Sequence, residues 1–238
     1  MRDAPDVVYV VSAYLSAYNA KAFGVRDYIA QLMFNSPPFV SDGMDLAKML
    51  AILEMLAPLE SPDFRIWRQT RTGLLSYPLE DNAARAHLAT SIYLQMALRP
   101  HIVHVVGHTE ADHAATAGDV IAASLAARRS IENALAGQPD MTVDPKIQAR
   151  KKHLIDQVQI TLQAIRNLAG EGIEDPHTNP AILAKAVKLG ILDAPQLKNN
   201  PFAPGAIRTR VVDGACEAVD ENGNIISEQE RLQGFFKE

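Results

Sequence analysis

Residues 102–116 read IVHVVGHTEADHAAT, a short apolar run followed by a polar loop that leads into a helix. Two further runs have the same character, VVYVV at 7–11 and FRIW at 64–67, and each is followed by polar sequence and then a helical segment. Short apolar runs rich in β-branched residues are typical of strands buried on both faces, as in parallel sheets. We therefore predict parallel strands at these three places.

Helical patterns separate and follow the predicted strands. Residues 45–57 repeat leucine and methionine with a period of about 3.6, which favours a helix with one apolar face. Residues 81–98 are expected to form a helix with Asp81 as N-cap, and residues 117–136 a helix that ends at Gly137. This alternation of strands and helices indicates right-handed βαβ units.

The second part of the chain is mainly helical by pattern. The pairs Asp144-Pro145 and Asn179-Pro180 are typical helix starts, because Asp and Asn cap a helix and proline suits its first turn. The alternation and turn residues of the tail favour a hairpin. The predicted elements are helices at 145–169 and 180–189, a fourth short strand at 191–194, and an antiparallel hairpin within 207–227 that turns at 221–224.

These elements predict an α/β fold: half of a (β/α)8 TIM-type barrel, with about four parallel strands, extra C-terminal helices and a small antiparallel hairpin. Residues 1–137 would hold the half-barrel βα units, and residues 138–238 the C-terminal helices, the last barrel strand and the hairpin of the same domain. Four strands leave two open edges. Either the sheet stays open, or a second chain or a second copy supplies the missing strands.

The composition excludes several classes of protein. The 238 residues carry a net charge of -5, which does not favour nucleic-acid binding. No apolar run approaches the roughly 20 residues of a membrane span, and the N-terminus lacks a signal-peptide pattern. The single cysteine, Cys216, is expected to be a buried small residue and fits a reducing compartment. We therefore expect a cytoplasmic protein that binds neither membranes nor nucleic acid.

Candidate site residues follow the second predicted strand. Active sites of parallel α/β folds lie at the carboxyl ends of the strands, and here the sequence 68–78 reads RQTRTGLLSYP. Arg68 and Arg71 suit a carboxylate or phosphate, because a guanidinium binds either group through two hydrogen bonds. Tyr77 is a further substrate-binding candidate. The alternative is that the arginines pair with the acidic neighbours Glu80 or Asp81.

The loop after the third predicted strand is unusually rich in ionisable groups. It contains His108, Thr109, Glu110, Asp112 and His113. Histidine and carboxylate at a strand end can transfer protons, hydrogen-bond a sugar or bind a metal. No cysteine is near, so we expect no metal site. The alternatives are that Thr109 caps the next helix, as Thr116 also could, and that His101 and His104 are core or edge residues.

The order of these segments resembles a known enzyme family. The segments that carry the resemblance are HIVHVVGHTEADHAAT at 101–116, ENALAGQPDM at 132–141, the long helix from Pro145, AKAVKLGILDAP at 184–195, and a hairpin followed by SEQER at 227–231. Together they resemble the C-terminal half of the catalytic (E) subunit of glutamate mutase, also called methylaspartate mutase, over nearly the whole chain at low identity. The resemblance implies a (β/α)8 barrel stacked on a small cobalamin-binding subunit, and an adenosylcobalamin-dependent radical isomerisation of a carboxylate substrate.

The resemblance assigns roles to several residues. It implies that Glu110 contacts the adenosine ribose, with Thr109 and Asp112 beside it as cofactor-binding residues. A family lysine four positions before Glu110 is replaced here by Val106. Arg71 is the nearest match to a family histidine close to the substrate. The residues that hold the substrate in the family lie mainly in its N-terminal half, which has no counterpart in this sequence.

These matches imply catalytic roles for Arg71, His108 and Glu110, with Arg68, Arg71 and Tyr77 as substrate-binding residues. The family's cobalamin-ligand pattern Asp-x-His-x-x-Gly is absent, so the resemblance implies that a partner subunit holds most of the cofactor. We therefore expect a hetero-oligomer that includes a barrel-completing chain or second copy, and a small anionic substrate. Two alternatives remain: a non-catalytic partner subunit of such a complex, and an unrelated α/β enzyme that acts on an anionic small molecule.

Overall fold

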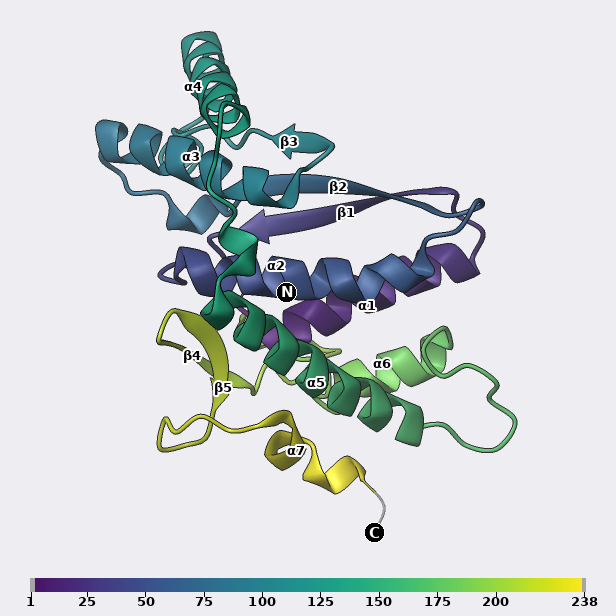
Figure 1. The fold of residues 1–238 in the computed structure, drawn as a ribbon. Coiled ribbons are helices and arrows are strands. Elements are labelled where there is room, and N and C mark those ends of the chain that lie inside the picture. Colours follow the sequence, from purple (N-terminus) through teal and green to yellow (C-terminus); the bar gives the residue numbers. More distant parts are fainter. Residues whose placement is uncertain (1–2, 237–238) are drawn as a thin grey trace.

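The computed structural model describes residues 3–236 and contains a three-stranded parallel sheet in the order β1-β2-β3 (Figure 1). The strands are β1 (Asp27–Phe34), β2 (Arg65–Thr72) and β3 (Ile102–His104). Helix α2 (Asp42–Leu56) connects β1 with β2, and α3 (Asp81–Gln95) connects β2 with β3. The predicted α/β class and the strands near 64–67 and 102–106 are confirmed. The described residues form three parallel strands instead of four, and these do not close into a barrel.

The two faces of the sheet differ in burial. Ala30, Leu32, Phe34 and Ile66 belong to the main core, which α2 and the helices at 6–22 and 145–167 form with the sheet. The other face is exposed or half-buried over most of its area, with Ile29 50 % exposed. We name this other surface the open face. It consists of Ile29, Gln31, Trp67, Gln69, Arg71, Ile102 and His104, which alternate with the core positions and lie in register across the strands.

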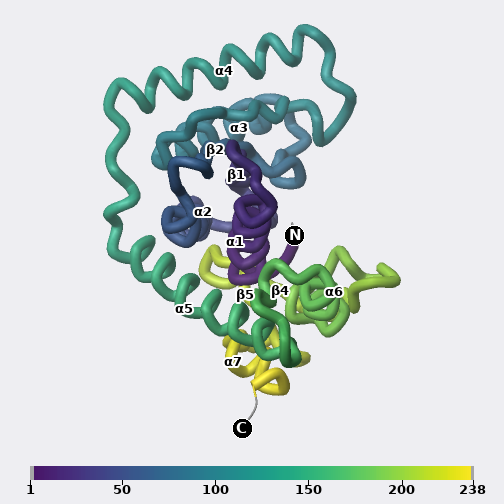
Figure 2. The backbone as a smooth tube through the Cα atoms, turned by 90° about the vertical axis from the view of Figure 1, so that its right-hand side faces the viewer, coloured from purple at the N-terminus to yellow at the C-terminus, as the bar shows by residue number. Residues whose placement is uncertain are grey.

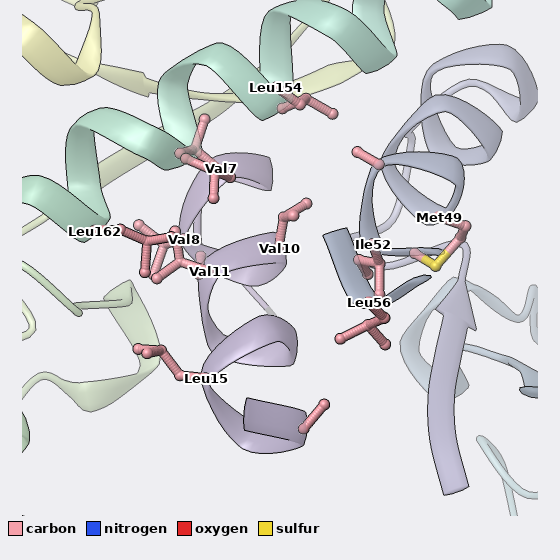
Figure 3. Packing of buried hydrophobic residues seen from close by; sticks show 14 of the residues in the cluster. Val7, Val8, Val10, Val11, Leu15, Met49, Ile52, Leu56, Leu154 and Leu162 are labelled. Carbon is pink, nitrogen blue, oxygen red and sulfur yellow. The ribbon is translucent and has the colours of Figure 1, made fainter. Parts of the chain in front are cut away.

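The prediction of a strand at 7–11 is wrong, because these residues belong to helix α1 (Asp6–Ala22). Its valines are buried between α2 and α5 (Pro145–Asn167), as Figure 3 shows. A short run of β-branched residues is compatible with a buried helix as well as with a buried strand. Here helix-forming residues follow the run, and together they form a helix of 17 residues. Contacts on two sides then outweigh the modest helix propensity of valine.

Strand β1 was not predicted, because its sequence DYIAQLMF does not alternate regularly between polar and apolar residues, although the burial of its side chains alternates at positions 28–32. The prediction of a strand at 191–194 is wrong. That segment is buried and irregular, because the Asp193 carboxylate accepts hydrogen bonds from the backbone N–H groups of Gly205, Ala206 and Ile207. These hydrogen bonds anchor the segment without a β-ladder.

The helices predicted at 45–57, 81–98, 117–136, 145–169 and 180–189 are present, with small shifts of their ends. Glu80, not Asp81, caps α3, because its carboxylate accepts from the N–H groups of Asn82 and Ala83. Helix α4 (Ala117–Leu135) lies on the outside of the molecule, beyond α3 (Figure 2). The other helices are α5, α6 (Pro180–Lys188) and α7 (Glu228–Arg231), with short 3-10 helices at Ala57–Leu59, Leu74–Ser76, Met96–Leu98, Met141–Val143, Pro195–Leu197 and Gln233–Phe235.

The predicted C-terminal hairpin is present, with an additional turn. Strands β4 (Arg208–Val212) and β5 (Ala215–Val219) pair antiparallel through Asp213 and Gly214, both with positive φ, as a tight two-residue hairpin turn requires. The predicted turn at 221–224 follows β5, is organised by Asp220, and is spanned by an antiparallel bridge between Val219 and Ile225. The division of the chain at residue 137 stays a prediction.

A buried group of charged side chains links helices α1, α2 and α5. Lys48 of α2 is 1 % exposed, and its Nζ lies 2.8 Å from Asp45 Oδ1 and 3.3 Å from Asp6 Oδ1. It also donates to the carbonyl oxygen of Ser36, just after β1. Asp6 in turn meets Arg150 of α5 at 3.0 Å. Burial alone would lower the pKa of Lys48, but the carboxylates of Asp45 and Asp6 raise it above its ordinary value.

No helix within residues 3–236 is both long and apolar enough to cross a membrane.

Candidate functional site

The carboxyl ends of the three strands meet at one edge of the sheet, because the strands are parallel. A buried polar network fixes the ends of β1 and β2. Ser91 of α3 donates to Asn35 Oδ1 at 2.6 Å and lies 2.8 Å from the Thr72 hydroxyl, and Gln95 donates to both hydroxyls. Gly73 follows, and a Cβ there would lie 2.7 Å from the carbonyl oxygen of Asn35. The strand-end loops therefore start from rigid positions.

Tyr77 ties the loop after β2 to the loop after β3. It is buried, and its hydroxyl donates to the carbonyl oxygen of Val106 at 2.8 Å. Its ring packs edge-on against His87. Burial raises the pKa of Tyr77 to about 12, and the charge of Glu110 adds to this rise, while that of Arg71 opposes it. Arg71, Tyr77 and Glu110 therefore share one electrostatic environment, although the hydroxyl of Tyr77 is already bonded to the protein.

Glu110 lies on the surface of the loop after β3. Its Oε1 accepts a hydrogen bond from the backbone N–H of Gly107 at 2.6 Å, which fixes the side chain against the loop. A Cβ at Gly107 would lie 3.1 Å from that same oxygen, so the absence of a side chain there permits the close approach. Glu110 is exposed, and its Oε2 has no hydrogen bond within the described chain.

Arg68 and Arg71 lie on opposite faces of β2, because they are three residues apart in a strand. The Arg68 guanidinium donates through Nε to the carbonyl oxygen of Arg99 at 3.1 Å. Arg71 is half-buried on the open face, and its one hydrogen bond within residues 3–236 is a long contact of 3.5 Å from Nε to the carbonyl oxygen of Thr72. Neither arginine pairs with Glu80 or Asp81, the acidic neighbours that the sequence offered, within residues 3–236. Arg71 thus remains available to an anion.

His108 is the most unusual polar side chain of the site. Its side chain is 1 % exposed, and neither ring nitrogen makes a hydrogen bond to any described residue. Nε2 lies 3.5 Å from Asp81 Oδ1 at the start of α3. The neighbouring Thr109 hydroxyl is also buried without a hydrogen-bond partner in residues 3–236. Buried polar groups normally form hydrogen bonds, so these two side chains, which form none within residues 3–236, make the loop after β3 a candidate site for a ligand.

Asp112 and His113 belong to a second, more exposed group. His113 Nδ1 lies 2.9 Å from Asp112 Oδ2, and its Nε2 lies 3.9 Å from Asp119 Oδ2. The hydrogen bond that the His113 ring donates to the Asp112 carboxylate raises the pKa of His113. Thr116 caps α4 in a reciprocal arrangement with Asp119, which confirms the capping alternative for Thr116. The charges of His108 and His113 both act on Asp119, so this group lies at the start of α3 and α4.

The candidate residues therefore separate into two groups. Arg71, Tyr77 and Glu110 lie together between the ends of β2 and β3, while His108 and Asp112 lie toward Asp81 and Asp119. Thr109 connects the two groups along the chain. The predicted roles of Arg68 and Tyr77 in substrate binding stay predictions, but both side chains hydrogen-bond to the protein.

Two further residues of the site were not among the predicted site residues. Asp81, which the sequence suggested as a helix cap or as a partner of the arginines, is the carboxylate nearest His108. His104 is exposed on β3, an edge strand of the described sheet, which agrees with its interpretation as an edge residue, and it lies in register with Arg71. The signal for His104 is its spacing of two residues from Ile102, which places both on one face of β3. His101 is structural, since its Nδ1 accepts from the Arg68 backbone N–H at 3.0 Å.

The Val106 side chain is buried in the small apolar cluster between α3 and α4, together with Leu88, Ile92 and Ala123. An ammonium group at this position would enter that cluster instead of the strand-end site.

No group of three or more metal-ligating side chains is arranged to hold a metal ion within the described part of the chain. No model of a known protein family matches the sequence, and no curated protein matches it.

Proposed function

We propose that the chain is a partial-barrel subunit of an adenosylcobalamin-dependent carbon-skeleton mutase, with a further chain or a second copy completing the barrel. The observation that carries this proposal is an incomplete parallel sheet whose open face leads to a strand-end group of Arg71, Tyr77 and Glu110. The resemblance of the segments at 101–116 and 184–195 to glutamate mutase supplies the reaction class.

Three features of the fold support a partner chain. Within residues 3–236, β1 and β3 each pair with a strand on one side alone, so each leaves an edge for another strand. Ile29 and Ile102, near these edges, are 50 % and 38 % exposed. Helix α4 packs against α3 on the outside of the molecule (Figure 2). Its Val120, Ile121 and Leu125 side chains are exposed. A neighbouring βα unit would cover such surfaces.

Glu110 fits a contact to the ribose of the cofactor. One carboxylate oxygen is fixed by Gly107, and the other is available to accept from a ribose hydroxyl. Adenosylcobalamin, held mainly by a separate small subunit, would supply the radical chemistry. The residues of this chain would bind and orient: Glu110 would hold the ribose, Arg71 would hold a carboxylate of the substrate, and the barrel would exclude water. His108, with Asp81 beside it, is a secondary candidate for proton transfer.

The proposal is tested by Glu110→Gln in the complex reassembled with its barrel-completing and cobalamin-binding chains. Loss of a charge-assisted hydrogen bond is expected to weaken adenosylcobalamin binding by roughly 10- to 100-fold and to abolish interconversion of glutamate and methylaspartate, the family's substrates. Glu132→Gln is the matched control, because Glu132 is an exposed carboxylate on α4 away from the strand ends. Unchanged cofactor affinity and turnover in Glu110→Gln would overturn the role of Glu110.

The buried Val106 side chain favours a second candidate function, a non-catalytic partner subunit that keeps the scaffold. Under this candidate the complex forms with this chain, but Glu110→Gln changes neither turnover nor cofactor affinity. An unrelated α/β enzyme would instead act on an anionic small molecule without any corrinoid subunit, so turnover by the chain alone would identify it.

A further inference from the structure

We propose that Arg71 and His104 together form a carboxylate-binding site on the open face of the sheet. The register of the strands places Arg71 of β2 directly beside His104 of β3. Neighbouring strands lie about 4.8 Å apart, and paired residues of parallel strands point to the same face. The two side chains therefore project side by side from the carboxyl end of the sheet.

Several arginines within residues 3–236 form ion pairs, and Arg71 forms none. Arg65 pairs with Asp27, Arg85 with Asp81, and Arg150 with Asp6. Arg71 is half-buried and forms no ion pair within residues 3–236. A partly desolvated guanidinium without a counter-ion is a strong binding partner for a carboxylate.

No carboxylate within residues 3–236 forms an ion pair with Arg71, and glutamine side chains lie next to it on the open face. The next row of the open face, one step toward the amino end, consists of Gln31, Gln69 and Ile102 and carries no charge. The nearest strand-end carboxylate, Glu110, is bonded to Gly107 and makes no ion pair with Arg71. His104 is exposed, so its ring can reach a bound ligand.

The chemical class of ligand follows from these groups. A guanidinium fork takes both oxygens of one carboxylate, and an imidazole N–H donates to one of them from the side. The site would therefore take a small organic anion with an accessible carboxylate, with the glutamine amides available to a second polar group. This inference deepens the proposed function, because it adds His104 to the substrate site, but its test requires neither a partner chain nor a corrinoid.

The test follows the histidine ring resonances of the full chain by NMR during a titration with succinate, against sodium chloride of equal ionic strength. The resonance that disappears in His104→Gln identifies His104. We expect succinate to shift it saturably, and Arg71→Gln to weaken binding at least 10-fold. Arg65→Gln is the matched control, since Arg65 lies on the same strand and face at the other end. Its affinity for succinate should equal that of the unaltered chain.

A His104 resonance that does not respond to succinate overturns the proposal, and so does equal weakening by Arg65→Gln and Arg71→Gln. Arg71→Lys provides a second check, because it keeps the charge and removes the fork, and it should bind with intermediate affinity. These results are independent of the mutase proposal, which fails or stands on binding of the corrinoid subunit.

Discussion

Replacing Lys48 by methionine tests the buried charges that hold the end of β1. Methionine has nearly the same length and fills the same apolar space, so the change removes the charge and little volume. Asp6 retains Arg150 at 3.0 Å, but Asp45 loses its only cation within the described residues. Asp45 would then keep one short hydrogen bond, from the backbone N–H of Asn35 at 2.5 Å.

The expected loss of stability in Lys48→Met follows from the burial of the Lys48–Asp45 ion pair. Removing one partner of a buried ion pair costs about 3–5 kcal/mol. We expect a loss of about 3 kcal/mol for Lys48→Met, near the lower end, because Asp6 keeps its arginine. For a chain of this length that corresponds to a fall in Tm of roughly 6–12 °C. Urea unfolding followed by circular dichroism measures the loss directly.

The pH dependence of Lys48→Met has a defined sign. Burial raises the pKa of Asp45, and the ammonium of Lys48 opposes that rise in the unaltered protein. Without Lys48 the pKa of Asp45 rises further, so the folded state binds its proton more tightly than the unfolded state does. Stability from such a group is present at low pH and is lost as the pH rises through the folded pKa. The deficit of the variant should therefore be smaller at pH 5 than at pH 8.

Lys152→Met is the control for this experiment, because the ion pair of Lys152 with Asp156 is exposed. Lys152→Met should lower the free energy of unfolding by less than about 1 kcal/mol. The double variant Asp45→Asn, Lys48→Met should be more stable than the sum of the single changes predicts, by roughly 1 kcal/mol or more. Equal losses for Lys48→Met and Lys152→Met would refute the reasoning.

Three further predictions concern single contacts. Tyr77→Phe should lower the free energy of unfolding by about 1–3 kcal/mol in urea titrations, since a buried carbonyl oxygen loses its donor. Gly214→Ala should lower the Tm, because Gly214 has a φ of +82° and a Cβ there would lie 2.2 Å from Ser41 Oγ; an unchanged Tm would contradict the turn geometry. Asp112→Asn should lower the pKa of His113, followed through its ring protons by NMR, because the hydrogen bond that raises that pKa is lost.

The sequence predicts much of the fold where its signals are local. The helix starts at Asp144-Pro145 and Asn179-Pro180 are capped as expected, because capping depends on side chains within a few residues. Gly190 ends α6 with a positive φ of +79° for the same local reason. The α/β class of the fold follows from the alternation of strands and helices along the first part of the chain.

The errors arise where distant contacts decide the structure. Residues 7–11 become helical because α2 and α5 bury them on two sides, which no local pattern reveals. The hairpin turns at Asp213 and Gly214, where Gly214 also fits closely against Ser41, a residue 173 positions earlier in the chain. The pairing of Arg71 with His104 depends on strand register, which sequence spacing alone does not specify.

Parts of the candidate site were visible in the sequence, and parts were not. The density of ionisable residues after β3 led to Glu110 and His108, and both lie at the strand-end edge. The bonding of Tyr77 to Val106 could not be predicted, because it joins loops that follow different strands. The separation of Arg68 from Arg71 follows from strand alternation once the length of β2 is known.

The most direct test of the proposed subunit role is to isolate the chain, with an affinity tag, from cells that naturally produce it. Mass spectrometry would identify the chains bound to it, and an absorbance spectrum would show whether a corrinoid is present. The account predicts a barrel-completing chain or second copy together with a small corrinoid-containing subunit. A stable monomer with neither a bound chain nor corrinoid absorbance would contradict it.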